Sequence, residues 1–177
     1  MSVAIPAVMS FAIVFGAVFT VLGQVMGAQA ASAQGAVAQY EAAFRSAHSD
    51  VRFVSISASK AGTDTDVYMT VTNRGMLSYA AFKDWEVIVR YTPNPGTETI
   101  LRIPYASAIA ANKWTVDHIY LDSSTSAAEV IEPGVLNPQE EARLRIQLSP
   151  KIKKDIWAMF TVAPPAGGPA TAFVEGP

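Results

Sequence analysis

The chain has 177 residues, enough for one ordinary domain and an appendage. Its net charge of -2 provides no basic surface for nucleic acid or for an anionic membrane surface. The absence of cysteine excludes a disulfide framework, a thiolate nucleophile and a thiolate metal site. Charged residues make up 16% of the chain, and the first of them is Glu41. The sequence therefore joins an uncharged N-terminal segment to a domain of ordinary soluble composition.

The uncharged segment is predicted to form one long helix over residues 3–47. Residues 3–31 are apolar over a length that would cross a bilayer, and residues 28–47 stay rich in Ala and Gln. Pro6 falls in the first turns, where a missing N–H costs least. Three interpretations remain open: a cleaved secretory signal, a single-pass membrane anchor, and a helix that leaves the membrane and packs against copies of itself.

Two ridges along the predicted helix favour the third interpretation, although Gly and Ala are also common in membrane spans. Small residues recur at every fourth position on one ridge, and bulky apolar residues form another. Large ridges fit the grooves that small residues leave on a neighbouring helix. The residues predicted to pack in a filament core are Phe11, Phe15, Gly16, Phe19, Leu22, Gly23, Gly27, Ala31 and Gly35.

After residue 48 the apolar pattern changes from helical to alternating, which is typical of half-buried strands. Turn signals such as Asn73-Arg74-Gly75 and Pro133-Gly134 separate the alternating runs. Several short strands in a domain of this size indicate an immunoglobulin-like sandwich. The predicted fold class is α+β, with one long hydrophobic helix at residues 1–48 and an all-β sandwich at residues 49–177.

The alternation also predicts on which face of its strand each tryptophan lies. Trp85 and Trp114 lie on strand faces predicted to point into the core, and Val116 and Tyr120 are placed on the same face as Trp114. Trp157 falls on the opposite face of its strand. It is therefore the candidate for an exposed aromatic contact between subunits.

The sequence carries no catalytic motif. His48 and His118 are far apart in the chain, and no phosphate-binding loop, nucleophile elbow or paired-histidine metal motif is present. The turn containing Asp64 and Asp66 has two open interpretations, a polar hairpin turn and a Ca²⁺ site completed by a further carboxylate. We predict that the protein is not an enzyme and uses no cofactor, no metal and no small-molecule substrate.

Three stretches resemble the archaellin family and the related class III pilin-like proteins. They are the uncharged run at residues 2–39, the strand and turn at residues 67–75, and residues 135–141. Ile5 stands where bacterial type IV pilins usually carry a glutamate, which favours the archaellin side. The resemblance implies an uncharged helix that leads into a β-sandwich. Archaellins polymerise with their helices in the centre of the filament and their sandwiches outside.

The resulting hypothesis is a structural subunit of an archaellum-like, type IV pilus-like surface filament that serves motility or adhesion. It predicts a homo-oligomer of identical subunits, in contact with the membrane before assembly and extracellular afterwards, with no nucleic-acid partner. One alternative is a membrane-anchored stator or envelope-binding module of the same machinery, which does not polymerise into the filament. Another is an anchored sandwich that binds carbohydrate or Ca²⁺.

Overall fold

The computed structural model describes the backbone of residues 4–129 and 131–177. Side chains are described for residue 20 and for residues 23–129 and 131–177. The chain divides into two compact units, Met1–Ala43 and Phe44–Pro177, and each is considered by itself. The domain boundary predicted between residues 48 and 49 stays a prediction.

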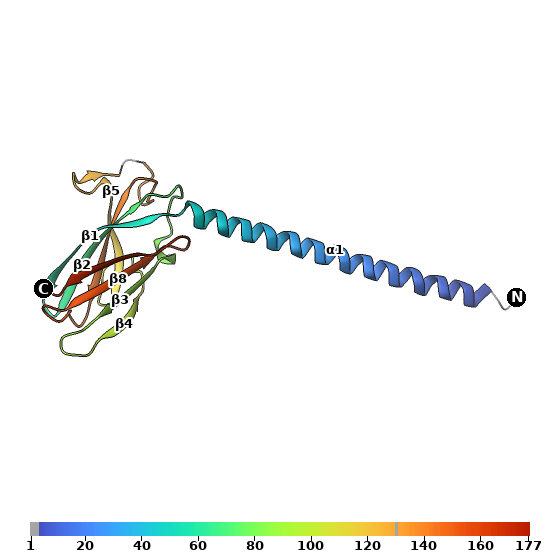
Figure 1. Ribbon diagram of the computed structural model, residues 1–177, viewed down its shortest axis with the longest axis horizontal. Helices are drawn as coiled ribbons and strands as arrows, with labels where there is room; N and C mark the ends of the chain where they lie inside the picture. The colour runs from blue at the N-terminus through green and yellow to red at the C-terminus, as the bar shows by residue number, and fades with distance from the viewer. Residues whose placement is uncertain (1–3, 130) are drawn as a thin grey trace. The chain divides into compact units, whose positions relative to one another are not determined.

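The first element is the helix α1, Ala4–His48, of 45 residues (Figure 1). From residue 23 to residue 47 the helix is rich in Ala and Gln, which cost little in a helix, and this stretch contains no proline. From residue 23 to residue 47 the described side chains are exposed. A helix of this composition gains little from burial within its own chain, and isolated helices are marginal in water. That other helices cover these exposed side chains stays a prediction.

The predicted fold class, α+β with a long hydrophobic helix, is wrong. The hydrophobic core consists of residues from the strands and their loops, and α1 contributes none of its described residues to it. No helix in the part of the chain with described side chains is long and apolar enough to cross a membrane. The physical reason is composition, because the Ala, Gln, Gly and Ser that dominate residues 23–47 carry little apolar surface. The structure is one helix followed by two antiparallel sheets, consistent with an immunoglobulin-like sandwich.

The first sheet has five strands in the order β1-β2-β7-β5-β6, and each neighbouring pair is antiparallel. Its strands are β1 (Val51–Ala61), β2 (Asp64–Asn73), β5 (Lys113–Asp122), β6 (Ala127–Ala128) and β7 (Glu141–Leu148). The second sheet has four strands in the order β4-β3-β8-β9. Its strands are β3 (Glu86–Tyr91), β4 (Thr99–Ile103), β8 (Trp157–Ala163) and β9 (Ala170–Glu175), and a short 3₁₀ turn, Phe82–Asp84, precedes β3.

The core lies between the inward faces of the two sheets and follows from strict alternation. In β7 every second residue is buried, and in β3 Val87, Val89 and Tyr91 face inward in the same way. Trp85 and Trp114 are buried, as the alternation predicts. Apolar residues at period two thus determine which face of each sheet is covered.

The face assigned to Tyr120 is wrong because of a β-bulge in β5. The register with β7 shifts between Val116 and His118, so that Val116 pairs with the inward Leu144 while Tyr120 pairs with Glu141 on the outward face. An extra residue in one strand reverses the alternation beyond it. Tyr120 therefore lies on the outer face of the five-stranded sheet.

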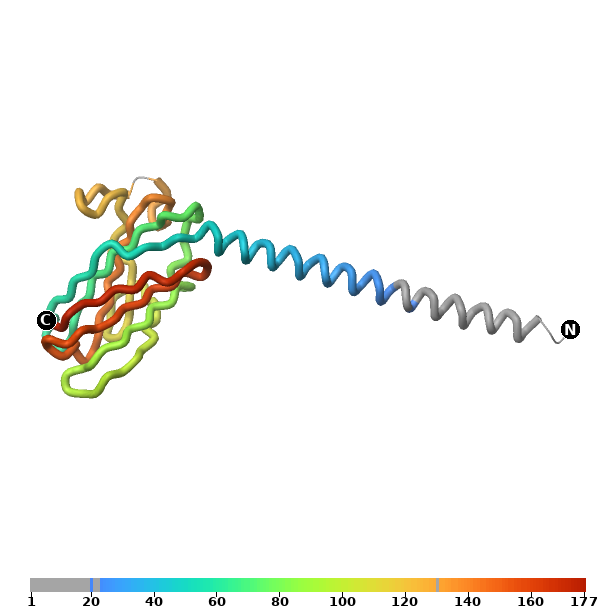
Figure 2. Tube along the Cα trace, in the orientation of Figure 1, coloured from blue at the N-terminus to red at the C-terminus, as the bar shows by residue number. Residues whose placement is uncertain are grey.

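The strands β1 and β9 belong to different sheets and lie side by side, as Figure 2 shows in teal and dark red. Each lies at one edge of its sheet. Their proximity closes the sandwich along this side, which limits the access of another strand to two otherwise free edges.

Candidate functional site

The small-residue ridge of the predicted filament core lies on the described part of α1. Gly23, Gly27, Ala31 and Gly35 are all exposed, and a Cβ added to any of the three glycines would meet nothing within 4 Å. Residues four apart fall on one helical face, so these positions form an open, shallow groove along the helix. Packing of a second helix into this groove stays a prediction.

The bulky ridge predicted from the sequence cannot be placed in the same way. The side chains of Phe11, Phe15, Gly16, Phe19 and Leu22 lie outside the described residues. Their contribution to helix packing also stays a prediction.

Trp157 lies on β8 with 63% of its surface exposed. The outward face of the same four-stranded sheet also carries Phe173 on β9, which is 58% exposed, and Ile100 on β4, which is 67% exposed. The register aligns Ile100, Arg90, Met159 and Phe173 in one row across β4, β3, β8 and β9. We call Ile100, Met159 and Phe173, together with Trp157 two residues before Met159 on β8, the outer apolar row. The subunit contact predicted for Trp157 stays a prediction, but its exposure places it on an accessible surface.

The two sequence stretches that resemble archaellins in the sandwich meet at Asn73. The buried Asn73 amide donates to the carbonyl oxygens of Leu77 (2.7 Å) and Leu136 (3.2 Å), and its Oδ1 accepts from the backbone N–H of Gly75 (3.1 Å). Its own backbone N–H donates to the carbonyl oxygen of Glu140 (2.9 Å). One side chain therefore satisfies backbone groups of two turns that are far apart in the chain. The sequence predicted a turn in each of the two stretches, but it did not predict that the two turns lie in contact.

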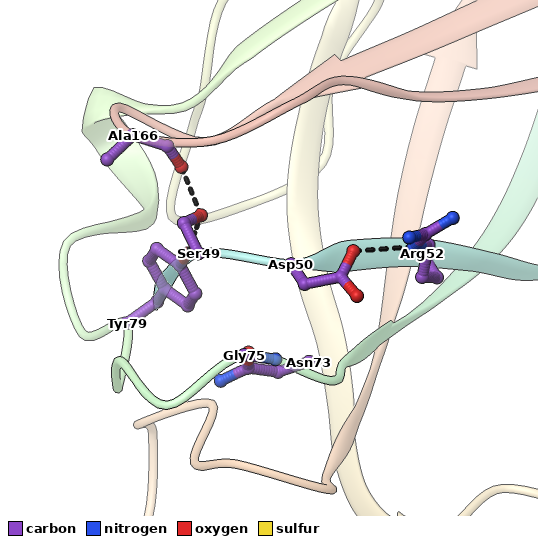
Figure 3. Close-up of polar contacts among 7 residues, drawn as sticks. All are labelled: Ser49, Asp50, Arg52, Asn73, Gly75, Tyr79 and Ala166. Atoms are coloured by element: carbon purple, nitrogen blue, oxygen red, sulfur yellow. Dashed lines mark hydrogen bonds and ion pairs between the residues drawn. The ribbon is translucent and has the colours of Figure 1, made fainter. Parts of the chain in front are cut away.

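The residues that connect α1 to β1 are held by two loops of the sandwich, shown in Figure 3. The Ser49 hydroxyl hydrogen-bonds to the Tyr79 hydroxyl and to the carbonyl oxygen of Ala166. Backbone N–H groups of Arg74 and Met76 donate to the carbonyl oxygens of Asp50 (2.7 Å) and His48 (2.8 Å). We call this arrangement around residues 48–50 the junction clasp. No sequence period predicts it, because it depends on loops brought together by the sandwich.

The clasp requires a close approach of backbone at Gly75. A Cβ there would overlap the carbonyl oxygen of His48 and lie 2.6 Å from the backbone nitrogen of Asp50. Glycine is therefore the residue that lets the loop after β2 lie directly against the chain that leaves the helix.

A charged cluster lies on the outward face of the five-stranded sheet. Arg143 binds Asp117 through Nε (2.7 Å) and Nη2 (2.6 Å), and its guanidinium lies over the rings of Tyr68 and Tyr120 at 5.6 and 5.5 Å. Burial raises the pKa of Asp117, but hydrogen bonds from His118 and Arg143 outweigh this effect and hold the pKa below its ordinary value. Asp117 is thus ionised and fixed in place at neutral pH.

The second interpretation of the Asp64 turn, a Ca²⁺ site, receives no support from the geometry. Asp66 binds Arg145 at 2.6 Å, and Asp64 accepts a hydrogen bond from Gln147 at 3.2 Å. Within the described residues no three His, Asp or Glu side chains are grouped to hold a metal ion. The two carboxylates, both on β2, instead connect this strand to β7.

One long N-terminal helix followed by an immunoglobulin-like sandwich has a counterpart among solved structures. Among solved structures, the chain is similar to a chain of the archaeal flagellum of Methanospirillum hungatei strain JF1, with 14% identity and a TM-score of 0.58 over 99% of this chain and 93% of that one. The resemblance to archaellins predicted from the sequence is confirmed at the level of the fold.

Two archaellum stator structures from Sulfolobus acidocaldarius are also similar. The periplasmic stator protein FlaG matches with 15% identity and a TM-score of 0.49 over 71% of this chain and 99% of that one. The FlaF and FlaG complex matches with 14% identity and a TM-score of 0.48 over 70% and 87%. No protein-family model matches the sequence, and no curated protein sequence matches it.

Proposed function

We propose that the chain is a structural subunit of an archaellum-like helical surface filament, with α1 packed in the filament core and the sandwich outside. The observation that carries the proposal is the exposure of the described side chains of α1 at residues 23–47, in a helix of 45 residues that leads into a sandwich with its own core. Such a helix is roughly 68 Å long at 1.5 Å per residue. The similarity to an archaeal flagellum chain over 99% of this chain supports the same arrangement.

The glycines of α1 support packing between helices. Each glycine inside a helix costs about 1 kcal/mol relative to alanine, so Gly23, Gly27 and Gly35 weaken an isolated helix. Close approach of a second helix along the groove that they leave would offset this cost through dispersion contacts. The same residues that destabilise a lone helix therefore suit a helix that is surrounded by others.

The outer apolar row provides a second contact surface in the proposed filament. Trp157 and Phe173 are large side chains that lie exposed on one sheet face, and aromatic residues are enriched in the buried centres of protein interfaces. In the filament this face would contact the sandwich of a neighbouring subunit.

The proposed subunit performs no catalysis, and a separate protein would drive any rotation.

The proposed location is extracellular, on a cell-surface filament. Contact with the membrane before assembly was predicted from residues 3–31, and most of these side chains lie outside the described residues. That contact stays a prediction.

The direct test is electron microscopy of appendages sheared from the cells, with mass spectrometry of their main protein. We expect thin, uniform filaments in which this chain is the principal component. If the filaments consist of another protein and this chain remains in the envelope fraction, the filament proposal is wrong and a stator or envelope-binding role replaces it.

A further inference from the structure

A polar groove crosses the outward face of the five-stranded sheet, on the side of that sheet away from the core. It has a volume of about 480 Å³. Ser55 and Ser57 of β1 form one side, and Ser123 and Ser126 of the β5–β6 turn form the other. The volume lies within the range of roughly 300–1,000 Å³ that small-molecule sites occupy.

The sides of the groove are held in place by hydrogen bonds. The Ser123 backbone N–H donates to the Glu141 carboxylate (3.1 Å), which ties the β5–β6 turn to β7. Asp122 accepts from both the backbone N–H (2.8 Å) and the hydroxyl (2.6 Å) of Ser124. These contacts order the turn, so a ligand would meet a site that is largely formed beforehand.

The floor of the groove is polar but carries no net charge. Its two charged lining residues, Asp117 and Arg143, bind each other, and Arg143 also lies over the rings of Tyr68 and Tyr120. An anion would have to compete with Asp117 for Arg143, and a cation would have to compete with Arg143 for Asp117. The electrostatics therefore disfavour a phosphate, a carboxylate or a metal ion as the ligand.

The remaining groups in the groove are hydroxyls and tyrosine rings. Hydroxyls both donate and accept hydrogen bonds, and tyrosine offers an apolar ring with a polar tip. The backbone groups of β2 and β7 are paired on both sides within the sheet, so the groove presents side chains rather than a free strand edge. An extended peptide that binds by strand addition needs such an edge, whereas a ligand rich in hydroxyls does not.

We propose that this groove binds a neutral saccharide, through hydrogen bonds to the serine and tyrosine hydroxyls and contact with the tyrosine rings. Ser57 lies at the side of the groove and Tyr68 in its floor. Ser59 lies two residues further along β1 on the same outward face, is exposed, and does not line the groove. The two serines therefore form a matched pair for testing the site.

The test uses the full chain, labelled with a fluorophore, on an array of neutral and acidic glycans. We expect binding to neutral glycans that is insensitive to salt, because no net charge is neutralised. Titration calorimetry with the best neutral glycan should show a loss of about tenfold or more in affinity for Ser57→Trp, which fills the groove. Ser59→Trp should bind as the original chain does.

Three results would overturn the proposal. They are the absence of binding to every neutral glycan, binding confined to acidic glycans and abolished by salt, and equal affinities for the two tryptophan variants. Thermal unfolding of both variants tests whether the sheet is intact, and we expect cooperative transitions like that of the original chain. The variant Tyr68→Phe, which removes a single hydroxyl, provides a milder second measurement and should weaken binding without altering the fold.

Discussion

Gly75 lies against the backbone that joins α1 to β1, and we expect this contact to be sensitive to a single methyl group. The change Gly75→Ala would place Cβ 2.6 Å from the backbone nitrogen of Asp50, so the junction clasp must shift. Overpacking of this kind costs about 1–3 kcal/mol. Urea unfolding should show this loss of stability. Gly168→Ala, where an added Cβ meets nothing within 4 Å, is the matched control and should be nearly neutral; equal losses in the two variants would contradict the prediction.

Asn73 is the residue at which the two turns meet, and its amide group rather than its size should matter. Asn73→Asp keeps the shape but replaces two N–H donors by an acceptor that faces the carbonyl oxygens of Leu77 and Leu136. Leaving buried carbonyls unsatisfied costs about 1–3 kcal/mol, and a buried charge adds to this. Chemical denaturation should report a large destabilisation. The same change at the exposed Asn94 should have little effect.

Asp117 should make the unfolding free energy of the sandwich depend on pH in the acidic range. Its folded pKa lies below the ordinary value of 3.8, so the carboxylate stabilises the folded state fully above that pH. The contribution is lost as the pH falls through the lower, folded pKa. The difference in unfolding free energy between the original chain and Asp117→Asn should be constant well above pH 3.8 and shrink below it. A difference that grows with acid would show that the pKa shift has the opposite sign.

A substitution in the helix α1 can separate an effect on filament assembly from an effect on folding. Gly27→Leu raises the intrinsic helix propensity by somewhat less than 1 kcal/mol, yet it fills the groove of the small-residue ridge. We expect unchanged or increased helicity by circular dichroism and loss of filaments by electron microscopy. Gln29→Leu, about 200° away around the helix, adds a similar side chain off the ridge and should still assemble. Normal filaments with Gly27→Leu would contradict the predicted packing.

The strands show how far a sequence pattern can lead. Alternation identified the buried face of β3 and β7 because apolar residues recur there without interruption. It misplaced Tyr120, since a single extra residue at the bulge in β5 reverses the faces beyond it. Bulges leave no reliable mark in one sequence, and the polar groove that includes Tyr120 was missed for this reason.

The junction clasp was also beyond prediction. Ser49, Tyr79 and Ala166 lie far apart in the chain and share no spacing or composition that would pair them. Their contact results from the assembly of both sheets. Long-range polar contacts between loops depend on tertiary structure, whereas helix length and strand alternation depend on local sequence.

For the whole molecule, the contrast between an uncharged segment and an ordinary domain was the most informative property of the sequence. It separated a helix from a sandwich and identified the architecture shared with an archaeal flagellum chain. The same composition led to the incorrect hydrophobic helix, because the absence of charge was interpreted as hydrophobicity over residues 1–48, although the described part is rich in Ala and Gln and carries little apolar surface.

The division into two units predicts that the sandwich folds without most of α1. The buried core extends from Val51 to Ala172, so a fragment of residues 44–177 retains all of it. We expect this fragment to unfold cooperatively and to run as a monomer in size-exclusion chromatography, with no filaments by electron microscopy. Filaments formed by the fragment would show that the sandwich, rather than the helix, drives polymerisation.

The junction clasp also has a mechanical consequence. Any tension carried along α1 into the sandwich must pass through residues 48–50, immediately before β1. β1 is an edge strand that pairs with β2 alone, so a pull at its first residue would peel it away one pair at a time. The hydrogen bonds that hold His48, Ser49 and Asp50 to two separate loops share that load before it reaches β1. In the proposed filament, the clasp would therefore protect the pairing of β1 with β2 from a force transmitted along α1.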